Sequence, residues 1–133
     1  MFSVRSRHFW AGEWFGIFHV IILIIMYLSM IRIYPAPEHE HAIIDILDSL
    51  RGPITAIADC LDCMISVEID GDRAICYLEK WQTYDALQQH LRSALYDRVL
   101  AAMELSRQPP DVTFYDVTEA GSLGLVEQAR LLH

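Results

Sequence analysis

Residues 77–96, YLEKWQTYDALQQHLRSALY, decide the fold of this chain. They complete a predicted strand, Arg73–Trp81, whose side chains alternate between two faces and which follows turn residues, as is typical of sheets. Thr83 follows as a candidate helix N-cap, and leucines then recur at helical spacing; Ser93 is a second candidate cap, with Tyr96 beyond it. A strand that ends in an indole therefore leads directly into a helix, which carries one imidazole, His90, about two turns from its start.

The flanking sequence predicts the other elements of an α+β domain. Helices are expected after the first and third strands, and a short helix is expected at the C-terminus. Gly52-Pro53 is expected to end the first helix, and Asp70-Gly71 predicts a tight hairpin between the second and third strands. The predicted strands are 27–34, 65–69, 73–81 and 112–117, and the final helix is 121–132. The order β-α-β-β-α-β is that of the ferredoxin-like split βαβ fold, with both helices on one face of the sheet.

The composition limits the classes of partner. A chain of 133 residues with 53% hydrophobic residues can build one core plus a short additional element. The net charge of −8, without a basic stripe, argues against nucleic acid as a partner. Three cysteines do not form a secreted disulfide scaffold, so a reducing, cytoplasmic location is expected. Because the second face of the sheet also needs cover, a homodimer is predicted.

An apolar N-terminal extension, residues 1–26, precedes the domain predicted at 27–133. The run 14–31 contains no Asp, Glu, Lys or Arg, and Arg5 and Arg7 precede it, as in a membrane anchor with its positive charges on the cytoplasmic side. Its length is at the lower edge of a membrane span.

The same run permits three interpretations. Residues 9–31 could anchor the domain to a membrane, or the extension could pack on its own or a neighbouring subunit. Alternatively, translation could begin at Met26 or Met30. The first interpretation competes with the predicted strand 27–34, because a residue cannot both span a bilayer and pair in the sheet.

Three stretches carry a resemblance to a known family. They are Cys60-Leu61-Asp62-Cys63, then Glu79-Lys80-Trp81 with Leu87, His90 and Ser93, and finally Pro110 with the strand that follows it. Residues from about 28 to 130 resemble the antibiotic biosynthesis monooxygenases, small dimeric α/β-barrel proteins that include quinol monooxygenases. The resemblance implies a ferredoxin-like homodimer that oxidises a small aromatic or quinol substrate with O₂ and without a cofactor.

The resemblance also implies roles for individual residues. Trp81 and His90 would be the catalytic residues and would face a cavity between sheet and helices. His90 would be the base, since an imidazole titrates near pH 7. The phenols of Tyr77, Tyr96 and Tyr115 would contribute to the substrate pocket. Each of these side chains could instead serve only to pack the core. No metal is expected.

The chain departs from the family at two positions. Many relatives have a second histidine where this chain has Leu95, so a base at that place is missing here. Haem-degrading relatives have an iron-binding histidine near the position of Leu100, so haem breakdown is disfavoured.

The pair Cys60 and Cys63 precedes a predicted strand rather than opening a helix, so two small buried side chains are the default interpretation. Two functions from other classes remain open. The chain could be a non-catalytic dimer that binds a small molecule, or an accessory subunit of a membrane complex.

Overall fold

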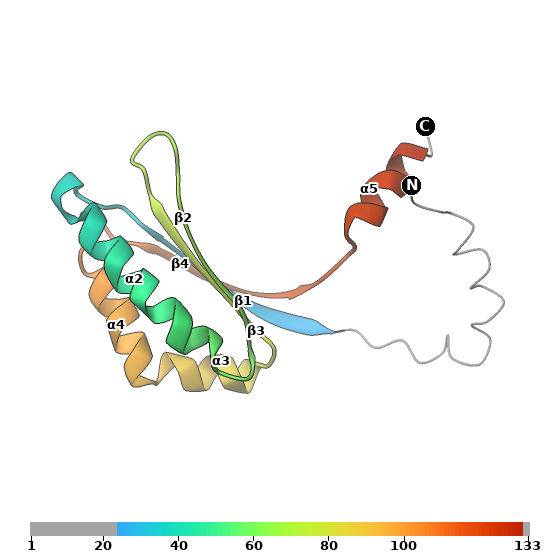
Figure 1. Ribbon diagram of the computed structural model, residues 1–133, viewed down its shortest axis with the longest axis horizontal. Coiled ribbons are helices and arrows are strands. Elements are labelled where there is room, and N and C mark those ends of the chain that lie inside the picture. The colour runs from blue at the N-terminus through green and yellow to red at the C-terminus, as the bar shows by residue number, and fades with distance from the viewer. Residues whose placement is uncertain (1–23, 132–133) are drawn as a thin grey trace. The chain divides into compact units, whose positions relative to one another are not determined.

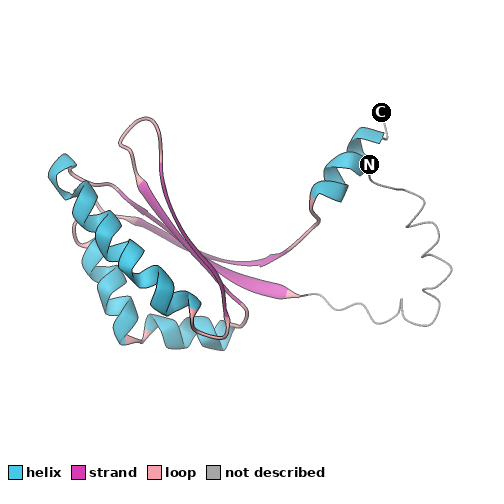
Figure 2. Cartoon of the chain, viewed as in Figure 1, coloured by secondary structure: helices cyan, strands magenta, loops and turns pink. Residues whose placement is uncertain are grey.

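The computed structural model describes residues 24–131, and it has the ferredoxin-like α+β fold that the sequence predicts (Figures 1 and 2). The strands form one sheet in the order β2-β3-β1-β4, in which β3 pairs antiparallel with both β1 and β2. The elements are β1 Ile25–Ile33, the 3₁₀ turn η2 Pro37–His39, α2 Glu40–Thr55, β2 Cys60–Val67, β3 Ile75–Trp81, α3 Tyr84–Leu91, α4 Ala94–Met103, β4 Asp111–Thr118 and α5 Leu123–Leu131.

Helices α2, α3 and α4 cover one face of the sheet (Figure 1). The odd-numbered side chains of β3 point towards these helices and are buried, whereas the even-numbered ones point to the other face. Helix α2 presents Ile43, Leu47, Leu50 and Ile54 to the same core, all of them fully buried. Each buried aliphatic side chain of this kind contributes about 1.5–3 kcal/mol, so this interface holds the helical layer on the sheet.

Three local predictions were wrong. Helix α2 continues past Gly52-Pro53 to Thr55, because a proline so near the helix end removes only one late hydrogen bond and the fully buried Ile54 anchors the last turn. Strand β2 begins at Cys60 instead of residue 65, since pairing with β3 extends along its whole length. The β2–β3 connection spans residues 68–74 and is not a two-residue hairpin; both Gly71 and Arg73 adopt positive φ in it.

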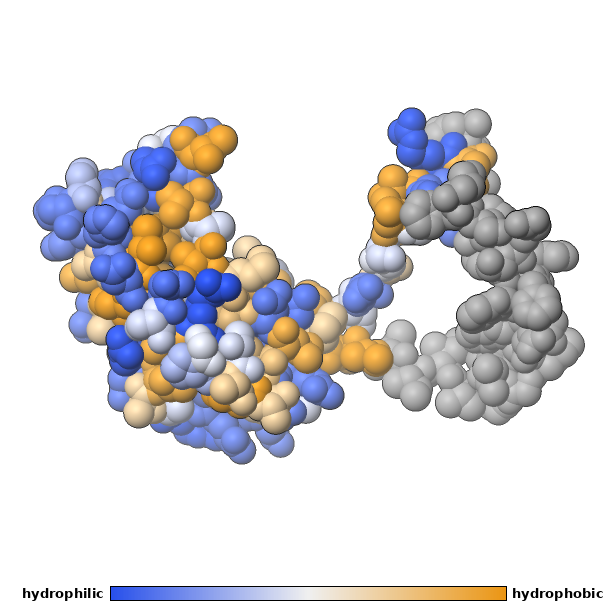
Figure 3. Space-filling view, in the orientation of Figure 1, coloured by the Kyte–Doolittle hydropathy of each residue, from blue (hydrophilic) through white to orange (hydrophobic). Residues whose placement is uncertain are grey.

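The contacts of the described chain group Ile25–Val117 into one compact unit. Hydrophobic side chains are exposed at the start of this unit (Figure 3), where Ile24 and Ile25 precede and open β1. Helix α5 lies outside the unit, and its Leu123, Leu125 and Val126 are exposed.

Strand β1 begins at Ile25 and its pairing with β3 begins at Tyr27, so the end of the predicted anchor 9–31 lies in the sheet. Residues 9–23 of that prediction lie outside the described residues. Within residues 24–131, no helix has both the length and the apolar character that a membrane crossing needs.

Candidate functional site

The side chain of Glu79 lies fully buried at the centre of the sheet, on the face that the helices cover. Three groups contact its carboxylate: the Tyr77 hydroxyl donates to Oε2 at 2.6 Å, the Trp81 indole N–H donates to Oε1 at 3.1 Å, and His90 Nε2 lies 3.0 Å from Oε2. A buried carboxylate without partners would be very costly, so these three contacts are what make a charge acceptable here.

Neighbouring strands add two further polar side chains to this centre. Ser29 of β1 and Cys63 of β2 both pair with Glu79 in the sheet register. The Cys63 thiol lies 3.5 Å from the Tyr77 hydroxyl, to which it donates weakly, while that hydroxyl donates to Glu79. The buried Ser29 hydroxyl finds no partner among residues 24–131. Glu79 is therefore the hub of a polar network inside an otherwise apolar core.

Two aromatic rings enclose the imidazole of His90. The Trp81 ring lies at a centroid distance of 4.7 Å with a tilt of 32°, and the Tyr96 ring meets it edge-on at 5.4 Å and 85°. The His90 side chain is 1% exposed. Its Nδ1 atom is buried and has no partner among the described residues, although the other ring nitrogen contacts Glu79. The imidazole is thus held in one orientation with one nitrogen unoccupied.

Two hydroxyl caps place His90 in this position. Thr83 accepts a hydrogen bond from the Ala86 amide at 3.1 Å and so begins α3 immediately after Trp81. Ser93 donates to the His90 carbonyl at 2.7 Å and accepts from the Tyr96 amide at 3.3 Å, so it separates α3 from α4. Both caps agree with the sequence-based prediction.

A cavity of about 290 Å³ lies beside this network. Its size is near the lower end of that of small-molecule sites, which suits a ligand of one or two rings. The apolar part of its lining consists of Ile57, Ala58, Trp81, Ala86 and Leu95. The polar part consists of Asp59, Gln89, His90 and Ser93. Among residues 24–131, the lining therefore combines an aromatic wall and an imidazole with a carboxylate and contains no lysine or arginine.

Burial governs the titration of several groups near the site. It raises the pKa of Tyr77, and the negative charge of Glu79 raises it further, so this phenol keeps its proton as a donor. Burial likewise raises the pKa of Tyr96, again with a smaller contribution from Glu79. Burial also raises the pKa of the Cys60 thiol to about 11 and raises that of Cys63. Because a reactive thiol needs a lowered pKa, the pair is not prepared for redox catalysis.

The structure brings four of the five predicted site residues together. Trp81 and His90 line the cavity. Tyr77 and Tyr96 do not belong to its lining, but Tyr77 contacts Glu79 and Tyr96 contacts His90. Tyr115 lies on β4, is 48% exposed and is not part of the lining. Within residues 24–131, no group of three or more His, Cys, Asp or Glu side chains could hold a metal ion.

Sequence reasoning missed the two acidic residues of the site. Glu79 shares the buried face of its strand with Tyr77 and Trp81, and an acidic residue in such a position is a detectable signal. Asp59 precedes β2 in the connection from α2, and nothing in its local sequence indicates that it lines a cavity.

The fold and the polar core define a small α+β protein with a cavity between helices and sheet. The family model for antibiotic biosynthesis monooxygenases matches residues 26–102, more than half of the chain, so the chain belongs to that family. The resemblance that the sequence motifs carry is thereby confirmed. No curated protein matches the chain.

Several solved structures share the fold. Rv0793 from Mycobacterium tuberculosis is 23% identical, with a TM-score of 0.65, and the match covers 73% of this chain and 99% of that one. Protein SO0527 from Shewanella oneidensis is 19% identical, with a TM-score of 0.66 and coverage of 75% and 98%. A solved antibiotic biosynthesis monooxygenase is 17% identical, with a TM-score of 0.61 and coverage of 70% and 99%. These similarities concern the fold.

Proposed function

We propose that this protein is a cofactor-independent monooxygenase that oxidises a small phenol or hydroquinone with O₂. The observation that carries the proposal is the cavity wall, where the Trp81 indole and the His90 imidazole lie together and one imidazole nitrogen has no partner among residues 24–131. Family membership supports the reaction class. Trp81 would flank the aromatic ring of the substrate, and His90 would accept a phenolic proton.

The lining also favours a substrate class. Asp59 supplies a carboxylate, and the lining residues that the structure describes include no arginine or lysine to pair with an anion. A hydroxyl group can donate to this carboxylate, whereas a substrate carboxylate would be repelled by it. A neutral dihydroxy-aromatic molecule therefore fits the cavity better than an aromatic acid does.

The proposed oxidation proceeds through a substrate anion and a radical pair. His90 takes a proton from one hydroxyl, and the electron-rich anion then transfers one electron to O₂. The semiquinone and superoxide combine, and protonation gives a ring hydroperoxide that loses water. For a naphthohydroquinone, one oxygen atom enters the ring to give a hydroxynaphthoquinone, and the other leaves as water. The cavity would contribute by excluding bulk water and by positioning the base.

An oxygen electrode provides the test. The full chain is supplied with neutral naphthohydroquinones and with a carboxylated analogue, and the spontaneous rate without protein is subtracted. Uptake should exceed the spontaneous rate for the neutral compounds and be weaker for the acid. His90→Gln keeps an N–H that can donate to Glu79 but removes the basic nitrogen, so it should lower the rate by about 10²–10⁴-fold.

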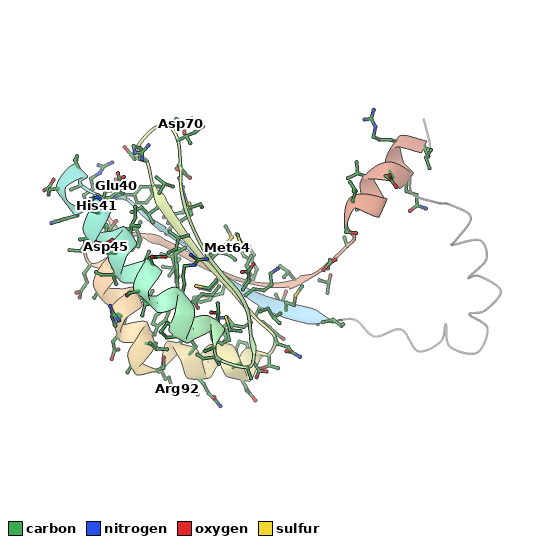
Figure 4. The ribbon with its side chains drawn as sticks, in the orientation of Figure 1. Glu40, His41, Asp45, Met64, Asp70 and Arg92 are labelled. Atoms are coloured by element: carbon green, nitrogen blue, oxygen red, sulfur yellow. The ribbon has the colours of Figure 1, made fainter. Side chains whose placement is uncertain are left out.

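His41→Gln is the matched control, because His41 is exposed near the start of α2 and points away from the sheet (Figure 4). Its rate should equal that of the wild type. Oxygen uptake no faster than the spontaneous rate with every compound would argue against the proposal. So would a His90→Gln rate equal to that of the wild type.

A second candidate, a dimer that binds a small molecule without converting it, is favoured by one observation. Leu95 lines the cavity at the position where many relatives carry a histidine. If that histidine is the base in the family, this chain keeps the pocket without it. Saturable quenching of tryptophan fluorescence by a hydroquinone, without oxygen uptake, would support this candidate over the enzyme.

We also propose that the chain forms a homodimer through the sheet face that the helices leave open. Met30 and Met64 both pair with Leu78 in the register, so the three side chains form a row across β1, β3 and β2. Met64 is 49% exposed and lies on the side of the sheet away from α2 (Figure 4). A second copy packed on this row would bury it, as the predicted dimeric barrel requires.

A further inference from the structure

We infer that Glu79 is a positioning residue which fixes the tautomer of His90, so that Nδ1 is the nitrogen that accepts the substrate proton. The inference rests on the proposed function, in which His90 is the base. Glu79 does not line the cavity. It acts through the imidazole of His90, which it contacts and which lines the cavity.

The contacts of Glu79 determine which ring nitrogen carries the proton. Oε2 already accepts the Tyr77 hydroxyl, and Oε1 accepts the indole N–H of Trp81, which can only donate. A carboxylate in this position offers His90 an acceptor and no donor. The neutral imidazole must therefore carry its proton on Nε2, which lies 3.0 Å from Oε2, and Nδ1 keeps its lone pair.

The contacts of the His90 ring leave this lone pair without a partner among the described residues. Nδ1 is buried and has no partner among residues 24–131, whereas Nε2 is occupied by Glu79. The Trp81 and Tyr96 rings both pack against the imidazole, and the Ser93 hydroxyl donates to the His90 carbonyl. His90 also belongs to the cavity lining. Because Glu79 occupies Nε2, Nδ1 is the ring nitrogen that is left to accept a proton.

The arrangement resembles the carboxylate–histidine pair of a serine hydrolase, in which the carboxylate accepts from Nδ1–H and Nε2 is the base. Here the carboxylate contacts Nε2, so the roles of the two nitrogens are exchanged. A carboxylate that accepts from one imidazole nitrogen orients the ring and stabilises the imidazolium that forms when the other nitrogen takes a proton. The charge that develops on His90 during the reaction would be balanced by Glu79, while Tyr77 and Trp81 hold the carboxylate in place.

The tautomer can be measured directly on the full chain labelled with ¹⁵N-histidine. Long-range ¹H–¹⁵N correlation at neutral pH separates a bare ring nitrogen from a protonated one, and His90→Gln identifies the His90 signals by their loss. The wild type should show a protonated Nε2 and a bare Nδ1. A protonated Nδ1 in the wild type would overturn the inference.

Glu79→Gln should reverse the tautomer. The amide oxygen must face the Trp81 indole, which only donates, so the amide NH₂ takes the place of Oε2 and donates to His90 Nε2. The proton then moves to Nδ1, and kcat should fall by about 10²–10⁴-fold with KM little changed. An unchanged tautomer in Glu79→Gln would also overturn the inference.

Tyr77→Phe is the matched control, because it removes a donor to Glu79 but leaves the His90 contact in place. Tyr77→Phe should keep the wild-type tautomer. If Glu79→Gln does not fold, the wild-type spectrum by itself shows whether Nε2 or Nδ1 carries the proton. The two proposals fail separately. A protein with the expected tautomer and no turnover would remove the proposed function and the role of Nδ1 as proton acceptor, but would leave the tautomer set by Glu79. Turnover with the opposite tautomer would remove only the inference.

Discussion

Glu79→Leu tests whether the buried carboxylate organises the core of the site. Tyr77, Trp81 and His90 all contact that carboxylate in the folded protein, and leucine accepts no hydrogen bond. Each buried donor left without an acceptor costs about 1–3 kcal/mol, so three cost about 3–9 kcal/mol. Burial of the leucine side chain offsets about 2 kcal/mol of this. We expect the free energy of unfolding to fall by about 4 kcal/mol, a large share of a typical domain's stability.

Urea unfolding at neutral pH measures this change. The protein concentration is held fixed, because the stability of the proposed dimer would depend on it. A sharper comparison measures the effect of Tyr77→Phe on the free energy of unfolding in the wild type and in Glu79→Leu. In the wild type it removes a hydrogen bond and should cost about 1 kcal/mol, whereas in Glu79→Leu it removes a stranded hydroxyl and should restore about 1–3 kcal/mol. If Glu79→Leu costs less than about 1 kcal/mol, or if Tyr77→Phe costs the same in both backgrounds, the carboxylate is not the hub that the geometry indicates.

Three further predictions use other parts of the structure. Because burial raises the pKa values of Tyr77 and Tyr96 above the ordinary value of 10.0, the folded state holds protons that the unfolded state releases. The stability that these phenols contribute should therefore be complete below about pH 10 and fall above it; equal unfolding free energies at pH 9 and pH 11 would contradict this. Burial raises the pKa of Cys60 from 9.0 to about 11, so iodoacetamide at pH 8 should label it about 100-fold more slowly than an unperturbed cysteine. Peptide mapping locates the label, and rapid labelling of Cys60 would count against the buried geometry. Finally, Leu78→Lys puts a charge at the centre of the open sheet face and should reduce the mass seen by light scattering from two chains to one, whereas a dimer that persists would place the interface elsewhere.

The fold could be predicted because its determinants are local. The alternation along β3, the cap at Thr83 and the second cap at Ser93 are all visible in a short window of sequence, and the structure confirms each of them. The end of α2 could not be predicted in this way. Local preference favours a stop at Pro53, but the burial of Ile54 outweighs it, and burial depends on tertiary packing.

The site could be predicted only in part, for a related reason. Trp81 and His90 stand out as isolated rings at a strand–helix junction, whereas Glu79 resembles an ordinary surface acid until its place on the buried face is considered. Its partner His90 comes from the next helix, so the pairing depends on how α3 packs. Asp59 reaches the cavity from the connection between α2 and β2, and no periodic pattern fixes the course of such a segment.

Oxidation of a neutral naphthohydroquinone under ¹⁸O₂ tests the monooxygenase assignment most directly. The quinone product is analysed by mass spectrometry immediately after a short reaction, beside a protein-free sample and the His90→Gln variant. The cavity chemistry predicts that the wild type forms a hydroxyquinone with one labelled oxygen much faster than either of the other two samples. Product formation no faster than in the protein-free sample, or a product that gains no oxygen from O₂, would contradict the assignment.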